Sequence, residues 1–385
     1  MLKYLKYYIP GISCILAIAM FLMGEYYPTI YLILFSLFLI LGDVFFQKDR
    51  KVQKFSYPFL LDLSMYVNLP ILFTLILLVV SIFSSDLSFW YVNFLNSIAF
   101  IDVYGLKSSF NIIDKISLVV QTALFIGILG TIPGHELTHR KKNKFDMLIG
   151  NWLLAFSWDC TFAIEHVYGH HKNVCLPEDP ASAKRGENIY LFIIRSIVQE
   201  QIDAWKIERD RLSRRGYYFF SFRNKMIIGH FRSVLLSLIF FVIGGIKGFV
   251  VFLLFAFIGK VLLEAINYIE HYGLVRERGK PVCLRHSWNS NHKISSLYLC
   301  NVTRHSDHHR AANLKFWELS PSDVDAPVLP YGYLGMLYLL LFLPFLYHRV
   351  MAKKLKEWDL NFANKGELRL ADIQNKNSGL SALNG

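Results

Sequence analysis

Charged residues are scarce in this chain of 385 residues, and the two signs are unevenly represented. Aspartate, glutamate, lysine and arginine make up 18% of the sequence, with 41 basic and 29 acidic residues and a formal net charge of +12. The basic residues border strongly apolar segments, as the positive-inside rule produces in membrane proteins. The charge pattern therefore indicates a membrane protein, with lipid rather than nucleic acid as its partner.

Cysteine is also rare. The five cysteines are scattered along the chain and form no C-x-x-C pair: Cys14, Cys160, Cys175, Cys283 and Cys300. An odd, unpatterned set argues against a disulfide framework and against a thiolate metal site, so we expect reduced thiols.

Apolar residues are abundant instead. They make up 54% of the chain, above the roughly 45–50% of soluble domains, and the mean hydropathy is +0.35. Six stretches approach the ~20 residues that a transmembrane helix needs. They are residues 8–24, 29–46, 57–83, 116–132, 226–243 and 249–266. No small-residue cleavage site follows Gly24, so we expect the first stretch to be a retained span. The sequence predicts an all-α integral membrane protein with six transmembrane helices.

The basic residues set the predicted orientation. The loop between the second and third stretches carries Lys48, Arg50, Lys51 and Lys54, which places it in the cytoplasm. The fourth and sixth stretches then both end on the cytoplasmic side. This orientation brings the histidines that follow those two stretches to one face of the membrane.

Other segments are predicted not to cross the bilayer. Residues 145–163 contain Asp146, Asn151 and Asp159, which are costly in lipid, so we expect a helix buried in protein at the cytoplasmic surface. Residues 331–346 are short for a span and are predicted to be interfacial. Residues 186–215 fit a surface helix. We expect one membrane-embedded catalytic domain over residues 1–362 and a polar, loosely ordered tail over 363–385.

Nine of the thirteen histidines fall into three clusters and one isolated position near the apolar stretches. They are His135, His139, His166, His170, His171, His271, His305, His308 and His309. Spacings of three and four residues place side chains on one helix face, and neutral imidazole is the commonest metal ligand. One ion uses three or four such ligands, so nine predict two metal ions. The remaining four are predicted to be core residues: His230, His286, His292 and His348.

The first cluster also matches a zinc-protease pattern, in which His135 and His139 bind zinc and Glu136 is the general base. That interpretation leaves seven clustered histidines without a role, so we favour two metals. Four carboxylates adjoin the clusters and are predicted to orient the imidazoles: Glu136, Glu165, Glu270 and Asp307. An imidazole-rich pair of ions beside apolar walls suits iron that activates oxygen against an unreactive C–H bond.

Four motifs carry a family resemblance: HELTHR (135–140), EHVYGHH (165–171), NYIEHYG (267–273) and RHSDHH (304–309). Together they resemble the membrane-bound alkane 1-monooxygenases, within the fatty acid desaturase and hydroxylase group of integral-membrane di-iron enzymes. Agreement extends to residues 177–190, 205–216 and HSWNSNH (286–292). One departure is Val302-Thr303, where the family usually has Leu-Gln, and the loop 310–330 is also less similar.

The resemblance implies that the nine histidines bind two non-haem irons at the cytoplasmic side of a bacterial inner (plasma) membrane. It implies hydroxylation of the terminal methyl of an apolar chain, using O₂ and electrons from NAD(P)H through a reductase and a rubredoxin- or ferredoxin-type carrier. A fatty-acid desaturase and an aromatic-methyl (xylene-type) hydroxylase stay open as alternatives. The basic residues near the clusters are predicted either to dock the carrier or only to enforce topology: Lys141, Lys142, Lys144, Arg304 and Arg310.

Overall fold

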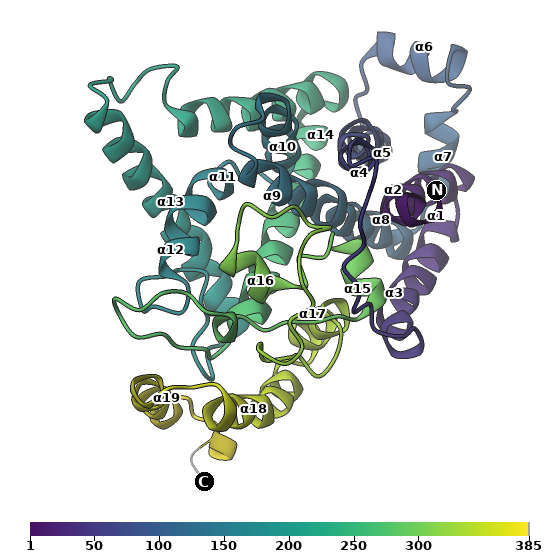
Figure 1. Cartoon of the computed structure of the whole chain (residues 1–385). Coiled ribbons are helices and arrows are strands. Elements are labelled where there is room, and N and C mark those ends of the chain that lie inside the picture. The colour runs from purple at the N-terminus through teal and green to yellow at the C-terminus, as the bar shows by residue number, and fades with distance from the viewer. Residues whose placement is uncertain (384–385) are drawn as a thin grey trace. The chain divides into compact units, whose positions relative to one another are not determined.

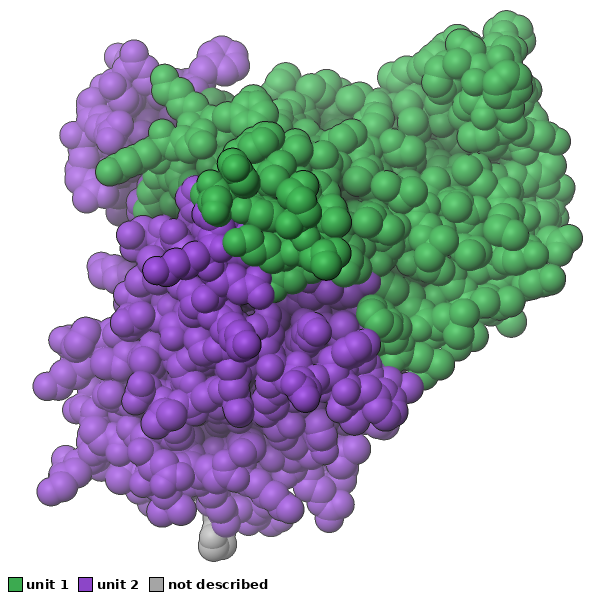
Figure 2. Space-filling view, turned by 45° about the vertical axis from the view of Figure 1, so that its right-hand side comes forward, with its two compact units in different colours: residues 1–38, 56–160, 227–262 green, residues 39–55, 161–226, 263–385 purple. Residues whose placement is uncertain are grey.

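The computed structural model describes residues 1–383, and every long element within them is a helix (Figure 1). The chain divides into two compact units, drawn in different colours in Figure 2. Unit 1 contains residues 1–38, 56–160 and 227–262, and unit 2 contains residues 39–55, 161–226 and 263–385. The expected single catalytic domain over residues 1–362 stays a prediction.

Five helical segments are long and apolar enough to cross a membrane. They are α1–α2 (Leu2–Met23), α3 (Tyr27–Phe45), α4–α5 (Phe59–Phe83), α8–α9 (Ile112–His139) and α14 (Lys225–His271). Helix α8 (Ile112–Phe125) is joined to α9 (Ile132–His139) by a π-helical turn over Ile126–Thr131. The first four segments match the predicted stretches. The fourth begins four residues earlier than predicted, at Ile112, and its carboxyl end continues through His135 to His139.

Helix α14 accounts for the remaining two predicted stretches, because it folds back on itself at Gly245, where φ is +61°. The rings of Phe240 and Phe252 have centroids 4.6 Å apart, although twelve residues of straight helix would separate them by about 18 Å. A Cβ at Gly248 would lie 2.8 Å from the Phe240 carbonyl oxygen, so the close approach of the two limbs requires glycine. The predicted break over residues 244–248 is confirmed.

Residues 145–163 do not form one long apolar helix. Helix α10 (Lys144–Ala155) has only twelve residues, about 18 Å, which is too short to cross a bilayer. Asp146 is within hydrogen-bonding reach of Tyr66 and Arg140, and Asp159 accepts from Lys260 at 3.0 Å. The acidic residues that argued against a span are therefore paired. In unit 1 the other short helices are α6 (Phe89–Ser97) and α7 (Val103–Ser109).

Unit 2 carries most of the remaining elements. They are α11 (Phe162–Glu165), a π-helical turn (His166–His170), α12 (His171–Asn173), α13 (Ile189–Arg214), α15 (Lys293–Tyr298), α16 (His305–Arg310), α17 (Tyr333–Phe342), α18 (Pro344–Asn361) and α19 (Lys365–Asn377). Helix α13 confirms the predicted helix over residues 186–215. Helix α17 has ten residues and is too short to span a bilayer.

The expected loosely ordered tail contains a docked helix instead, so that expectation is wrong for residues 365–377. Asn364 caps α19, and its side chain accepts from the backbone of Gly366 and Glu367. The buried Glu367 carboxylate accepts from Arg285 at 2.9 Å and lies 2.8 Å from Nε2 of His286. The sequence looked polar because this helix is attached by charge pairs rather than by an apolar face.

Candidate metal centre

His135 and His139 lie one turn apart on α9, in unit 1, with ring centroids 4.8 Å apart. The Glu136 carboxylate between them in sequence accepts from Arg140 at 2.7 Å, and Arg140 also contacts Asp62. A carboxylate held in this ion pair is poorly suited to act as the general base of a zinc protease. The same contact leaves its predicted role in orienting an imidazole untested.

The second histidine motif forms a widened helical turn in unit 2. The N–H of His171 donates to the carbonyl of His166, five residues earlier, which defines a π-helical turn. Such turns recur at functional sites. Here the turn sends adjacent residues to different places: His171 Nε2 lies 3.1 Å from His166 Nε2, whereas His170 Nε2 lies 3.2 Å from His309 Nε2.

Four buried histidines converge in unit 2 from the π-helical turn, the end of α14 and α16. This four-histidine cluster is His170, His271, His305 and His309, and its ligand nitrogens all lie within 4.8 Å of one another. The Nε2 atom of His305 is 3.1 Å from that of His271 and 2.9 Å from that of His309. The isolated His271 of the sequence is thus placed among the clustered histidines.

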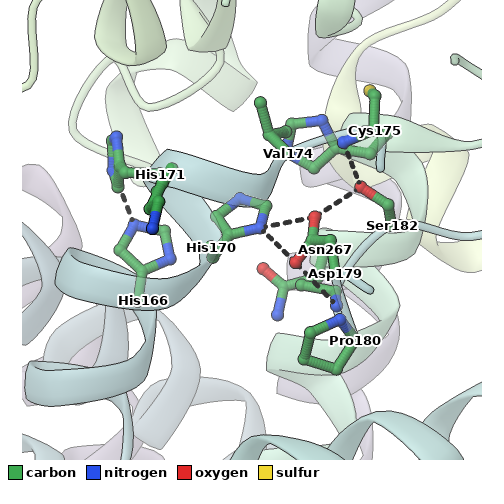
Figure 3. A network of polar contacts seen from close by, with 12 residues as sticks. His166, His170, His171, Val174, Cys175, Asp179, Pro180, Ser182 and Asn267 are labelled. Carbon is green, nitrogen blue, oxygen red and sulfur yellow. Dashed lines mark hydrogen bonds and ion pairs between the residues drawn. The ribbon is translucent and has the colours of Figure 1, made fainter. Parts of the chain in front are cut away.

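Two of these imidazoles have a defined tautomer. Nδ1 of His271 is 3.0 Å from the His286 backbone carbonyl, which only accepts hydrogen bonds, so Nδ1 carries the proton. Nδ1 of His170 is 3.0 Å from both carboxylate oxygens of Asp179 (Figure 3). Burial alone would raise the pKa of Asp179, but His170 and Ser182 hold that pKa below its ordinary value, so the carboxylate accepts. Both inward Nε2 atoms therefore present lone pairs.

This donor arrangement fits a metal ion. Ligand nitrogens 2.9–3.2 Å apart suit an ion about 2.0–2.1 Å from each of them. Burial lowers the pKa of His308 to about 3 and the pKa of His309 well below its ordinary value, so both imidazoles are neutral ligands at physiological pH. Facing lone pairs without a cation would repel one another.

Three more histidines lie together in unit 2, and we call them the three-histidine cluster: His166, His171 and His308. The His308 ring centroid is 4.9 Å from that of His171, and the His166 ring stacks on Phe162 at 4.2 Å. His171 is only partly buried. Seven of the nine predicted ligands thus form two clusters within unit 2. The other two, His135 and His139, lie in unit 1.

The carboxylates predicted to orient imidazoles have different environments. Glu270 Oε1 lies 3.3 Å from Nδ1 of His305, and its role in orienting an imidazole stays a prediction. Asp307 instead pairs with Arg310 and accepts from the N–H of Ser320 at 2.7 Å. Glu165 lies against Gly169, where a Cβ would meet its carboxylate oxygen at 2.3 Å.

Sequence reasoning missed two groups that orient imidazoles, namely Asp179 and the backbone carbonyl of His286. Both belong to stretches recognised only as similar to a family, residues 177–190 and 286–292. The signal for Asp179 was an acidic residue between two prolines shortly after the second cluster. A backbone carbonyl leaves no such signal, because every residue has one.

The four histidines predicted to be core residues lie outside both clusters within the described part of the chain. His286 meets Glu367, His292 Nδ1 lies 2.9 Å from the Ser290 hydroxyl, and His348 Nε2 lies 2.9 Å from the Tyr268 hydroxyl. His230 lies on α14, with its ring centroid 6.4 Å from that of Trp158.

The docking role predicted for Arg304 is wrong. Its side chain is 1% exposed, and its guanidinium donates to the carbonyls of Leu319 and Asp49. This arginine fixes loops and presents no charge to a partner. Arg310 has an exposed side chain, and Lys141, Lys142 and Lys144 are exposed.

Comparison with known families matches residues 116–339 to the fatty acid desaturase family, a range that includes all nine clustered histidines. Alkane 1-monooxygenase 1 of Pseudomonas aeruginosa is 36% identical over 64% of this chain and 65% of its own length. Alkane 1-monooxygenase of Acinetobacter baylyi is 39% identical over 69% of this chain and 66% of its own. The chain thus spans about two thirds of the length of these curated relatives. The xylene/toluene monooxygenase hydroxylase component XylM of Pseudomonas putida is 30% identical over 97% of this chain and 95% of its own.

Proposed function

The chain belongs to the fatty acid desaturase family of membrane enzymes, and we propose that it hydroxylates the terminal methyl group of an alkane or a related apolar chain. The observation that carries this proposal is the four-histidine cluster, in which the ligand nitrogens of four buried histidines lie within 4.8 Å of one another and the tautomers of His170 and His271 are fixed. The relatives named alkane 1-monooxygenase support the choice of substrate class.

We assign two irons to the nine histidines. The four-histidine cluster would hold one ion, and the three-histidine cluster would contribute ligands to the other. Bound iron would supply the activation of O₂ that an unactivated C–H bond demands.

The protein itself fixes the imidazoles. Asp179 and the His286 carbonyl keep protons on the outer Nδ1 atoms, so that Nε2 stays available. Glu270 and Asp179 face outer nitrogens rather than the space between the Nε2 atoms. We therefore expect two ions that lack a bridging carboxylate and lie further apart than in carboxylate-bridged sites.

The same proposal includes six membrane crossings, with the two limbs of α14 counted separately, and a site at the cytoplasmic face of the bacterial plasma membrane. The folded-back α14 and the basic loop containing Lys48, Arg50, Lys51 and Lys54 support it. An apolar substrate would then enter from the bilayer, where such molecules concentrate.

A small acidic rubredoxin- or ferredoxin-type carrier, reduced by NAD(P)H through a reductase, would deliver electrons near Lys141, Lys142, Lys144 and Arg310. Complementary charge mainly raises association rate and is screened over about 8 Å at physiological salt. Turnover at limiting carrier should fall steeply as salt rises, and reversing the three lysines to glutamate should slow it without changing iron content. Turnover that responds to neither change would leave these residues with a topological role.

A second candidate is hydroxylation of an aromatic methyl group, which the nearly full-length match to XylM favours. Desaturation of a fatty acid or lipid is a third outcome, open to any member of the matched family. The purified enzyme, reconstituted in lipid with its carrier, should be given alkanes, xylenes and fatty acids, and its products identified by mass spectrometry. A 1-alkanol supports the proposal, a benzylic alcohol supports the second candidate, and an alkene supports the third. A preparation active with one zinc and no iron overturns all three.

A further inference from the structure

Helix α13 has an exposed apolar face that the metal centre does not use. Its inner face is buried through Phe192, Ser196, Glu200 and Ala204. A second stripe is apolar and between 43% and 67% exposed: Leu191, Ile194, Val198 and Ile202. Spacings of three and four residues align these four side chains along the helix. We call them the α13 stripe.

Both ends of α13 are fastened to the ends of α14. Near the carboxyl end, Glu208 accepts from the backbone N–H of Lys225, the first residue of α14, at 2.6 Å. Just before the amino end, the hydroxyl of Tyr268 donates to the carbonyl of Glu187. Tyr268 lies in the last turn of α14, three residues before His271.

The fold of α14 sets the depth of these two attachment points. Lys225 is 20 residues before the turn at Gly245 and Tyr268 is 23 residues after it. At about 1.5 Å per residue, both lie roughly 30–35 Å from the turn, close to the ~30 Å hydrocarbon thickness of a bilayer. With the two limbs of α14 crossing the bilayer as proposed above, a helix attached at both points runs along one membrane boundary.

Aromatic and basic residues around α13 match such a boundary. The loop that leads into α14 exposes at least 86% of each of Tyr218, Phe220 and Phe222. Aromatic side chains gather at membrane–water interfaces. The carboxyl end of α13 and this loop are also basic, through Arg209, Arg211, Arg214, Arg215 and Arg223. Clustered basic residues of this kind attract anionic headgroups.

Apolar exposure continues beyond the other end of α13. The hydroxyl of Tyr190 donates to the carbonyl of Leu341, near the end of α17. Phe342 and Phe345, which follow Leu341 in sequence, are largely exposed. The α13 stripe thus has a further set of exposed apolar side chains beyond each of its ends.

We propose that α13 is an interfacial amphipathic helix, with the α13 stripe inserted at the boundary between lipid headgroups and acyl chains. The polar flank of the helix, which includes Gln199, Asp203 and Lys206, would then face the aqueous side. This assignment is independent of the metal and of the reaction.

The test places a reporter on each flank of α13 in the full-length protein. Cys283 and Cys300 are replaced by serine, since the other three cysteines are buried. Ile202→Cys and its control Asp203→Cys, which lie about 100° apart around the helix, are each labelled with a small fluorophore. The proteins are placed in nanodiscs of phosphatidylcholine and phosphatidylglycerol with brominated acyl chains, which quench only on contact with lipid.

Quenching should be several-fold stronger at position 202 than at position 203, and equally strong at Phe222→Cys. Comparable quenching at 202 and 203 overturns the proposal. Weak quenching at both positions also overturns it, because a protein partner or a second copy would then cover the stripe. Should Ile202→Cys fail to elute as a folded protein on size exclusion, Val198→Cys serves as the apolar reporter with the same two outcomes.

Discussion

The two histidine clusters of unit 2 differ in the burial of their imidazoles. In the four-histidine cluster every member is buried, and Asp179 and the His286 carbonyl fix the tautomers of His170 and His271. In the three-histidine cluster His171 is partly exposed, and the rings pack against one another and against Phe162. The four-histidine cluster is therefore fully buried with two fixed tautomers, whereas the three-histidine cluster has a partly exposed member.

The sequence motif alone does not show which cluster each of its histidines joins. His170 and His171 are adjacent in one motif, yet they join clusters of unlike burial because the π-helical turn separates their directions. We expect the four-histidine cluster to bind its ion more tightly. We expect the three-histidine cluster to tolerate changes in ligand position more readily.

The substitution His271→Ala should have the largest effect on the four-histidine cluster. It removes a ligand whose tautomer is fixed, so the four-histidine cluster should no longer hold its ion. The variant should lose about half of its iron and all detectable hydroxylation, while eluting as a folded protein in detergent. Elemental analysis and product assay measure both effects. His230→Ala, which changes a histidine outside the clusters, is the control, and wild-type activity in His271→Ala would reduce His271 to a core residue.

A second test changes the orienting group and keeps the ligand. Asp179→Asn retains an acceptor for His170 but removes the charge that stabilises its Nδ1–H, and comparable losses cost about 10–100-fold in metal affinity. Chelator titration should show one of two irons leaving more readily. The matched control is Asp203→Asn, on the polar flank of α13. Unchanged release in Asp179→Asn would mean that packing alone holds the four-histidine cluster.

A third test acts on the turn that serves both clusters. A Cβ at Gly169 would lie 2.3 Å from the Glu165 carboxylate, whereas a Cβ at Gly127, in the other π-helical turn, meets nothing within 4 Å. Gly169→Ala should therefore cost about 1–3 kcal/mol as overpacking. Gly127→Ala should change little. Thermal unfolding measures both, and equal melting temperatures would show that Glu165 moves aside freely.

The smallest expected effect concerns the contact between Glu367 of α19 and His286, the residue whose backbone carbonyl orients His271. Burial alone would raise the pKa of Glu367, but hydrogen bonds from His286 and Arg285 hold it at about 2, below the ordinary 4.5. Because the folded pKa is depressed, the contact is fully stabilising above about pH 4.5 and is lost as pH falls toward 2.

Hydrogen exchange across residues 365–377, corrected for intrinsic rates, should show this loss in the wild type. Glu367→Gln should show weaker protection at neutral pH and no pH step in the same window. Glu357→Gln, which changes an exposed pair with Lys354, should retain the step. A step that survives in Glu367→Gln would assign the acid sensitivity to another group.

Much of this fold is predictable because its signals are local. Apolar runs predict α2, α3, α5 and α8, and the interruption between the stretches 226–243 and 249–266 predicts the turn at Gly245. The histidine ligands are equally visible, since few other roles require so many imidazoles. Asp179, the His286 carbonyl and the docking of α19 were missed because each depends on contacts between distant residues. Arg304 was misjudged because sequence shows a charge but not its burial.

The contact between Glu367 and His286 has a consequence for the order of biosynthesis. Translation produces all nine histidines before it reaches residue 367, yet the loop whose carbonyl orients His271 is clamped by Glu367. The orienting carbonyl is therefore secured only after the last ligand histidine has been made. Docking of α19 therefore completes the support of the four-histidine cluster only after all of its histidines have been made.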